Sequence, residues 1–381
     1  MKKLVFLILF LLYIPIYLCG CTHDFSRKEI DEIDLVLVLG IDYADGVYHL
    51  SALYNSGGGA DPEEGGKAGK EEVANGEGKS PYEALEDLKR KNKKAISLAQ
   101  AGSFLIGDGA AEFGIKESLD FLFRDETIKM EGLFYIIKDM SASDFIKTSM
   151  ENEQSIYEDL EAMKQKQQEM LTKNDNTVVN ILNDLEQSYT SLLIPYLIND
   201  EAGYIIEGYA VFDQFKLIDY LDQQTSDGVN FIKNIMRSYP IYLDNGVSLL
   251  ITYTKTKVNA DIQNQEIAIV IKLDFETSIK EILAKEDIFS QEELTKLTQE
   301  QNEYIEKVLE KAVIYSKNSG LDILNLARLV ENQNYSEWKS IERDWHNKIS
   351  QINYEYKIKS RISKSFILGR NLRYQAEWRL V

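Results

Sequence analysis

Cysteine, histidine and proline are scarce in this chain of 381 residues, which contains two cysteines, three histidines and five prolines. The two cysteines, Cys19 and Cys21, both stand at the end of an apolar N-terminal run. The rest of the chain has no cysteine, so it has no thiol pair, which excludes disulfides and a cysteine-based zinc site there. With only His23, His49 and His346, a histidine-rich metal site is excluded as well. We therefore predict no metal and no cofactor.

The N-terminus has the features of an export signal. Lys2 and Lys3 form a short positive region, and an apolar run follows over residues 4–19. A membrane-spanning helix needs about 20 apolar residues, so this run is short for a span, and it contains Pro15. An uncleaved membrane anchor is therefore the weaker alternative. The run ends at Leu18-Cys19-Gly20-Cys21, which resembles the lipobox of bacterial lipoproteins.

This resemblance implies that residues 1–20 are a signal peptide and that Cys21 becomes the acylated N-terminus of the mature protein. A diacylglyceryl group on Cys21 supplies two acyl chains, which anchor a protein stably where one chain binds only marginally. Residues 21–34 are polar and charged, and we interpret them as a tether. The folded part of the protein would then lie outside the membrane.

The chain also has fewer basic than acidic residues, 43 against 62. Without Lys2 and Lys3 the mature chain carries a formal charge of −21. That balance repels nucleic acid and anionic lipid headgroups. The basic run at residues 89–94 is therefore interpreted as a solvated helix face and not as a nucleic-acid site.

Large apolar residues are almost absent between residues 57 and 78, where eight of the 22 glycines occur. Such a segment buries too little surface to offset its ordering entropy, so we predict a disordered loop over residues 56–79. The alternative, a phosphate-binding loop, lacks the G-K-[ST] ending. A second glycine-rich turn lies at residues 107–114. The dinucleotide-binding fingerprint is G-x-G-x-x-G, and here the third glycine, Gly114, comes two residues too late. We therefore predict an ordinary β–α turn there.

Sequence signatures of catalysis are missing as well. The chain contains no H-E-x-x-H, G-x-S-x-G or Walker sequence. Its many carboxylates permit a glycosidase pair in principle, but the sequence singles out no such pair. We predict no catalytic residue and a protein that is not an enzyme.

The periodicity of the apolar residues alternates between strand and helix patterns. Strands are predicted at residues 35–41 and 48–54, and a strictly alternating strand at 266–276. A capped helix begins at Ser80-Pro81, with apolar residues at helical spacing as far as Ala99. The fold class is α+β, with three domains that each have a mixed or antiparallel sheet packed by helices. We place an N-terminal domain at 35–190, a middle domain at 191–246 and a C-terminal domain at 247–381.

Several segments, spaced over nearly the whole chain, resemble the Ger(x)C family, the lipoprotein C subunits of spore germinant receptors. After the lipobox and Cys21, the resemblance is carried by Arg27–Ile30, Asp34–Asp42, Glu83–Leu85, Leu119–Asp125, Gly208–Phe212 with Lys216-Leu217, and Glu337-Trp338-Lys339 with Trp345. Their order and spacing make the match specific, although no single segment is decisive.

The resemblance implies residence on the outer face of the inner spore membrane and assembly with integral-membrane A and B subunits. Together these subunits would trigger germination in response to nutrients. The family has no established catalytic residues to carry over, so the only site residue that we predict is the lipidation site, Cys21. A membrane-anchored solute-binding lipoprotein is the alternative, and a cell-wall hydrolase is the weakest hypothesis.

Overall fold

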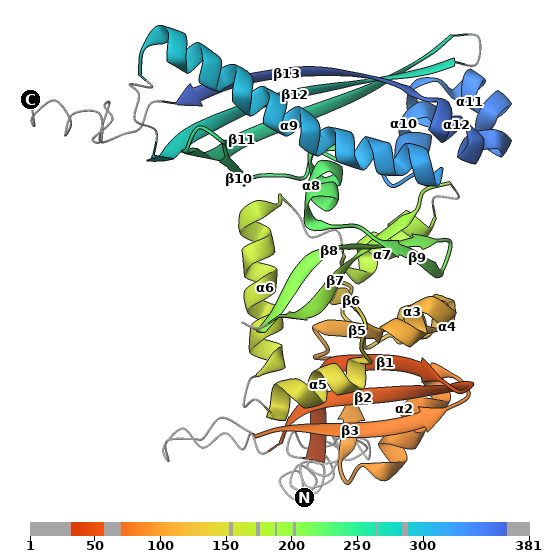
Figure 1. Ribbon diagram of the computed structural model, residues 1–381. Helices are drawn as coiled ribbons and strands as arrows, with labels where there is room; N and C mark the ends of the chain where they lie inside the picture. The colour runs from red at the N-terminus through yellow and green to blue at the C-terminus, as the bar shows by residue number, and fades with distance from the viewer. Residues whose placement is uncertain are drawn as a thin grey trace, which may run out of the picture.

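The computed structural model describes residues 32–56, 70–151, 155–172, 176–186, 189–200, 203–263, 266–283 and 289–363. These residues form two β-sheets with helices packed against them (Figure 1). The larger sheet occupies the lower and middle parts of the view in Figure 1, and the smaller sheet lies at the top. The predicted class, α+β with mixed sheets packed by helices, is confirmed.

The larger sheet contains nine of the described strands. Their order is β3-β2-β1-β5-β6-β7-β8-β9, and the short strand β4 pairs with the start of β1. The bounds are β1 (Ile33–Ala44), β2 (Val47–Ser56), β3 (Lys70–Gly78), β4 (Ala95–Ser97), β5 (Ser103–Gly107), β6 (Leu133–Ile137), β7 (Leu192–Asp200), β8 (Gly203–Asp213) and β9 (Lys216–Tyr220). Strands β1, β5 and β6 are parallel, and the hairpins at both ends make the sheet mixed.

Helices cover both faces of this sheet. Their bounds are α2 (Pro81–Lys91), α3 (Asp108–Phe113), α4 (Lys116–Arg124), α5 (Ala142–Glu151), α6 (Ile156–Met170), α7 (Val178–Leu185) and α8 (Gln223–Ile232). Leu85 of α2 and Leu119 of α4 are buried with Phe104 in one core cluster. Phe145 of α5 and Leu160 of α6 belong to a separate cluster. Alternate side chains of the central strands supply the two clusters.

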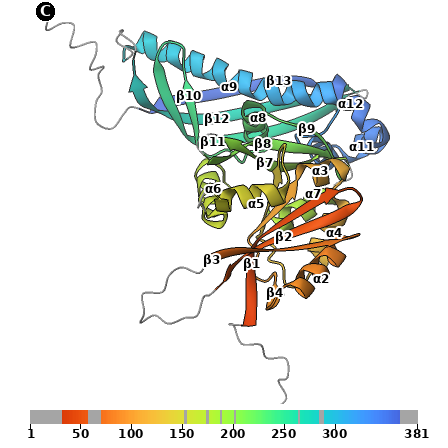
Figure 2. The same ribbon diagram turned by 60° about the horizontal axis from the view of Figure 1, so that its bottom comes forward.

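The smaller sheet has the order β10-β11-β12-β13, with β10 (Tyr239–Tyr242), β11 (Val247–Gln263), β12 (Glu266–Ile282) and β13 (Asn353–Ser363). The long helix α9 (Gln291–Ser319) lies along it, followed by α10 (Leu326–Gln333), α11 (Tyr335–Ile341), a 3₁₀ turn (Glu342–Asp344) and α12 (Trp345–Gln351) (Figures 1 and 2). The predicted alternation in β12 is confirmed, because Ile267, Ile269, Ile271, Leu273 and Phe275 are all buried. They share a core cluster with Ile305 and Leu309 of α9.

Two predictions about local structure are wrong. Residues 70–78 of the predicted disordered loop form strand β3, which pairs antiparallel with β2. A Cβ atom on Gly76 or Gly78 would overlap the backbone of α2, so these glycines let the helix lie directly on the strand. The helix that begins at Pro81 ends at Lys91, and Ala95–Ser97 is strand β4 instead of a continuation of that helix.

The predicted domain boundary at 190/191 falls between elements of one sheet. Strands β7, β8 and β9 extend the larger sheet and β10 joins the smaller one, so the described part of residues 191–246 has no sheet of its own. The connection at this boundary is narrow, because β6 and β7 pair at only two positions, Ile136 with Tyr196 and Ile137 with Leu197. The division into three domains stays a prediction.

Candidate functional site

The predicted lipidation site, Cys21, lies outside the described residues. So do the signal peptide, the first part of the tether and residues 57–69 of the predicted loop. Glu32, one residue before β1, is the first described residue. Among the described helices, none is both long and apolar enough to cross a membrane. The acylation of Cys21 stays a prediction.

The glycine turn at residues 107–114 has a structural role. Asp42 at the end of β1 accepts hydrogen bonds from the backbone N–H groups of Ala142 (2.7 Å) and Ser143 (2.9 Å), and so caps α5. Burial raises the pKa of Asp42, and these two hydrogen bonds oppose the rise. A Cβ atom on Gly107 would overlap the Asp42 carboxylate, so glycine is required there. The predicted β–α turn is confirmed, with α3 beginning directly after β5.

The tryptophans near the C-terminus are also structural. Trp338 and Trp345 are buried, with ring centroids 5.1 Å apart in an edge-to-face arrangement. The Trp345 indole N–H donates to Asp322 Oδ2 over 3.2 Å. The Asp322 carboxylate also accepts from the backbone N–H groups of Leu326 (2.8 Å) and Ala327 (2.7 Å), which begin α10. This cluster fixes α10, α11 and α12 against one another.

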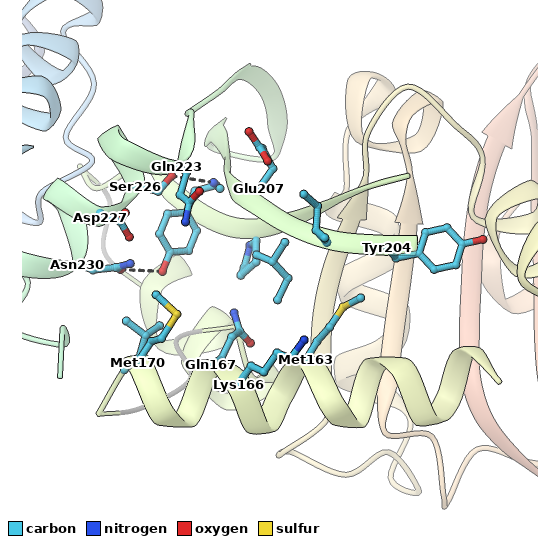
Figure 3. Close-up of a pocket in the computed structure, with 16 residues that line it drawn as sticks. Met163, Lys166, Gln167, Met170, Tyr204, Glu207, Gln223, Ser226, Asp227 and Asn230 are labelled. Carbon is cyan, nitrogen blue, oxygen red and sulfur yellow. Dashed lines mark hydrogen bonds between the residues drawn. The ribbon is translucent and has the colours of Figure 1, made fainter. Parts of the chain in front are cut away.

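A pocket of about 260 Å³ lies between α6, strand β8 and α8. In Figure 3, Met163, Gln167 and Met170 project from α6 toward β8 and α8. Asp227 and Asn230 project from α8 on the opposite side. The α6 side of the lining therefore combines two methionines with the polar side chains of Lys166 and Gln167, and the α8 side is polar.

Backbone packing brings α8 close to β8 at this pocket. A Cβ atom on Gly208 would overlap the carbonyl oxygen of Leu221 and lie 2.8 Å from Ser226 Oγ, so glycine allows the approach. Ser226 Oγ accepts the backbone N–H of Tyr209 over 3.1 Å. The Tyr209 hydroxyl donates to Asn230 Oδ1 over 2.8 Å, which fixes the aromatic ring in the pocket wall.

Two hydrogen-bond acceptors in this pocket have no partner among the described residues. Asp227 is only 6% exposed, and no hydrogen bond or ion pair joins its carboxylate to another described group. Burial, with the nearby charge of Asp222 as a second cause, raises the pKa of Asp227 from 3.8 to about 7. On the α6 side, Gln167 Oε1 is buried and also unpartnered within the described chain. These acceptors make the pocket a candidate binding site.

Sequence reasoning missed this pocket. The residues of α8 that line it, Gln223, Ser226, Asp227 and Asn230, repeat at helical spacing and are all polar, a pattern that normally marks a solvent-facing stripe. No local signal distinguishes that stripe from a pocket wall. The described residues contain no group of three or more histidine, cysteine, aspartate or glutamate side chains placed to hold a metal.

Two family models match the chain in sequence order. The "Spore germination protein N-terminal domain" matches residues 26–198, and the "Spore germination B3/GerAC like, C-terminal" domain matches residues 207–365. Together they account for most of the sequence. The chain belongs to the Ger(x)C family of spore germination proteins. The resemblance found in the sequence is thereby confirmed.

Individual Ger(x)C proteins are distant from this chain in sequence. The spore germination protein GerQC of Bacillus cereus is 21% identical over 349 residues, which cover 87% of this chain and 92% of that protein. The crystal structure of the GerBC protein has 16% sequence identity and a TM-score of 0.55, over 85% of this chain and 96% of that one. At that identity the structural likeness establishes the shared fold.

Proposed function

We propose that this protein is the lipid-anchored, non-catalytic C subunit of a spore germinant receptor. In this proposal it assembles with integral-membrane A and B subunits, and the complex triggers germination in response to nutrients. The observation that carries the proposal is the match to both Ger(x)C domain models, in order, over residues 26–198 and 207–365. The lipobox-like sequence Leu18-Cys19-Gly20-Cys21, which precedes the first matched residue, agrees with it.

The fold is compatible with anchoring through Cys21. Eleven residues separate Cys21 from the start of β1 at Ile33, and a fully extended segment of that length spans at most about 40 Å. In Figure 1 β1 lies toward the lower end of the molecule, and the smaller sheet lies at the upper end. A tether of this length would hold the end with β1 to β4 near the outer face of the inner spore membrane, and the smaller sheet farther away.

A non-catalytic role agrees with what two of the buried carboxylates do. Asp42 and Asp322 each accept backbone N–H groups at the start of a helix, which is a structural use of a carboxylate. The pocket beside α8 is lined by the buried carboxylate of Asp227 and the half-buried carboxylate of Glu207. A glycosidase-like hydrolase requires two carboxylates placed across one substrate, so the proposal of a non-catalytic role rests on the family match and not on this pocket.

A membrane-anchored solute-binding lipoprotein is the second candidate, and the same pocket is the observation that favours it. A pocket of about 260 Å³ with unpartnered acceptors can hold a small molecule. Its position differs from the cleft between two large lobes that this class would show, because it lies between helices beside one strand. Ligand binding is also compatible with a receptor subunit, so the pocket alone does not separate the two functions.

Co-purification of partner proteins distinguishes the receptor subunit from the solute-binding lipoprotein. Spore membranes are solubilised in a mild detergent, the tagged protein is captured, and co-purifying proteins are identified by mass spectrometry. A receptor subunit brings down two polytopic membrane proteins in constant ratio, whereas recovery of the protein alone would contradict the proposal. A Cys21→Ala variant tests the anchor separately, since it should leave the membrane fraction while the folded domain stays intact.

A further inference from the structure

The pocket between α6, β8 and α8 contains two acceptors for which the structure shows no hydrogen bond from a described donor. The Asp227 carboxylate lines it from α8 and Gln167 Oε1 lines it from α6. Gln167 Oε1 is buried without a described partner, and the pKa of Asp227 is governed by burial and the charge of Asp222, with no hydrogen bond among its causes. Buried polar groups in folded proteins are almost always paired, and an unpaired buried carboxylate is costly. A donor from outside the chain would satisfy both groups.

The other lining residues indicate what kind of molecule could carry this donor group. Met163 and Met170 line the α6 side, and the ring of Tyr209 lines the β8 side. Thioether and aromatic side chains form an adaptable apolar surface, and an aromatic face also attracts a cation. A cavity of about 150 Å³ holds benzene, so the volume of about 260 Å³ here fits a ring with a short side chain.

We propose that this pocket binds a small primary amine in its ammonium form. Its charged group lies between the Asp227 carboxylate and the Gln167 carboxamide oxygen, and its apolar body lies against Met163 and Met170. The three charged residues that line the pocket, Asp227, Glu207 and Lys166, sum to a net negative charge, which favours a cation over an anion. Lys166 is exposed, so it does not occupy the buried position beside Asp227.

The ligand comparison uses three probes with a shared apolar body. 2-Phenylethylamine supplies the ammonium group, 2-phenylethanol is its neutral counterpart and 3-phenylpropanoate is an anionic one. Binding of each to the purified full-length mature protein in detergent is measured by calorimetry. We expect saturable binding of the amine, with the alcohol about tenfold to a hundredfold weaker and the acid weaker still. Equal affinities for amine and alcohol, or no binding of the amine, would overturn the proposal.

Two variants locate the ammonium group. Asp227→Asn keeps the shape of the side chain and removes its charge, so it should reduce amine affinity to that of the alcohol. Glu169→Gln removes one carboxylate from an exposed position of α6 outside the pocket and should leave amine affinity unchanged. If Asp227→Asn binds the amine as tightly as the wild type, the assignment of Asp227 is wrong.

The pH dependence gives a test that needs no variant. Amine affinity of the wild type should fall as the pH drops through about 7, because Asp227 takes up a proton and loses its charge. The other groups near Asp227 are Asp222, the N-cap residue of α8, and Tyr239 on β10, with Glu207 and Lys166 on the pocket lining. Alcohol binding should stay constant over the same range, and a parallel fall for both probes would contradict the role of Asp227. Because binding is measured on the isolated protein, its failure leaves the receptor assignment intact.

Discussion

Replacing Asp227 by asparagine should make the unliganded protein more stable at neutral and alkaline pH. The folded chain holds a proton on Asp227 up to about pH 7, whereas the unfolded chain releases it near the ordinary pKa of 3.8. A group whose pKa is raised in the folded state contributes stability that is fully present below about pH 4. That contribution is lost as the pH rises through about 7, where the buried carboxylate must ionise.

The size of the effect follows from the difference between the two pKa values. One pKa unit corresponds to about 1.4 kcal/mol, so a rise from 3.8 to about 7 corresponds to about 4 kcal/mol at pH 8 and above. Asparagine carries no charge to desolvate, and Asp227 is too buried for solvent to screen the effect strongly. We therefore expect Asp227→Asn to raise the free energy of unfolding by up to about 4 kcal/mol at pH 8, and to change it little near pH 4.

Urea unfolding of the purified protein, followed by tryptophan fluorescence, measures this difference. Trp338 and Trp345 are buried in the same core cluster as Val229 and Phe231 of α8, so their emission reports the unfolding of this region. The matched control, Glu169→Gln, should shift the free energy of unfolding by less than about 0.5 kcal/mol at either pH. An Asp227→Asn variant that is no more stable than the wild type at pH 8 would mean that burial does not raise the pKa of Asp227, and so would a gain of equal size at both pH values.

Two further substitutions test the packing of the C-terminal part. Asp322→Ala removes the acceptor of two backbone N–H groups at the start of α10 and of the Trp345 indole, so it should destabilise the protein by about 3–5 kcal/mol in urea unfolding. A near-neutral effect would mean that these bonds do not form. Gly228→Ala places a Cβ atom against the Val308 carbonyl oxygen where α8 meets α9, and should cost about 1–3 kcal/mol by thermal melting. Gly102→Ala is its control and should be tolerated, because the nearest atom lies 3.9 Å from the added Cβ.

Features set by local chemistry could be predicted from the sequence. The hairpin between β1 and β2 turns at Asp45 and Gly46, both with positive φ, as the Asp-Gly pair indicates. Ser80 accepts the backbone N–H of Glu83 at the start of α2, as the capping signal predicts. The alternation in β12 likewise follows from a single buried face, and β13 alternates between exposed and half-buried residues.

Features set by tertiary packing could not be predicted. Residues 70–78 have the composition of a loop, yet they form a strand because β2 supplies hydrogen-bond partners and α2 lies on Gly76 and Gly78. The apolar residues of Ala95–Ser97 continue the helical spacing of the preceding segment, yet Ala95–Ser97 pairs with the start of β1. The chain turns at Asn92 before this strand, and the Asn92 side chain donates to Asp34 Oδ2 over 2.8 Å. Strand β7 was not predicted, and Pro195 within it weakens the strand pattern.

The candidate pocket could not be predicted from the sequence either, because tertiary packing forms it. Asp227 and Gln167 are 60 positions apart in the numbering, and they line one pocket only because α6 and α8 flank β8. The burial of Asp227 depends on Gly208 and Gly228, which let α8 approach β8 and α9 closely. Neither glycine has a positive φ that would have marked it as a turn residue.

The chemical state of the mature N-terminus decides whether one lipid-modified residue holds the folded protein outside the membrane. Mass spectrometry of the protein extracted from spore membranes should show a chain that begins at Cys21 and carries a diacylglyceryl group on its sulfur. A chain that still begins at Met1, or a Cys21 with a free thiol, would contradict the account.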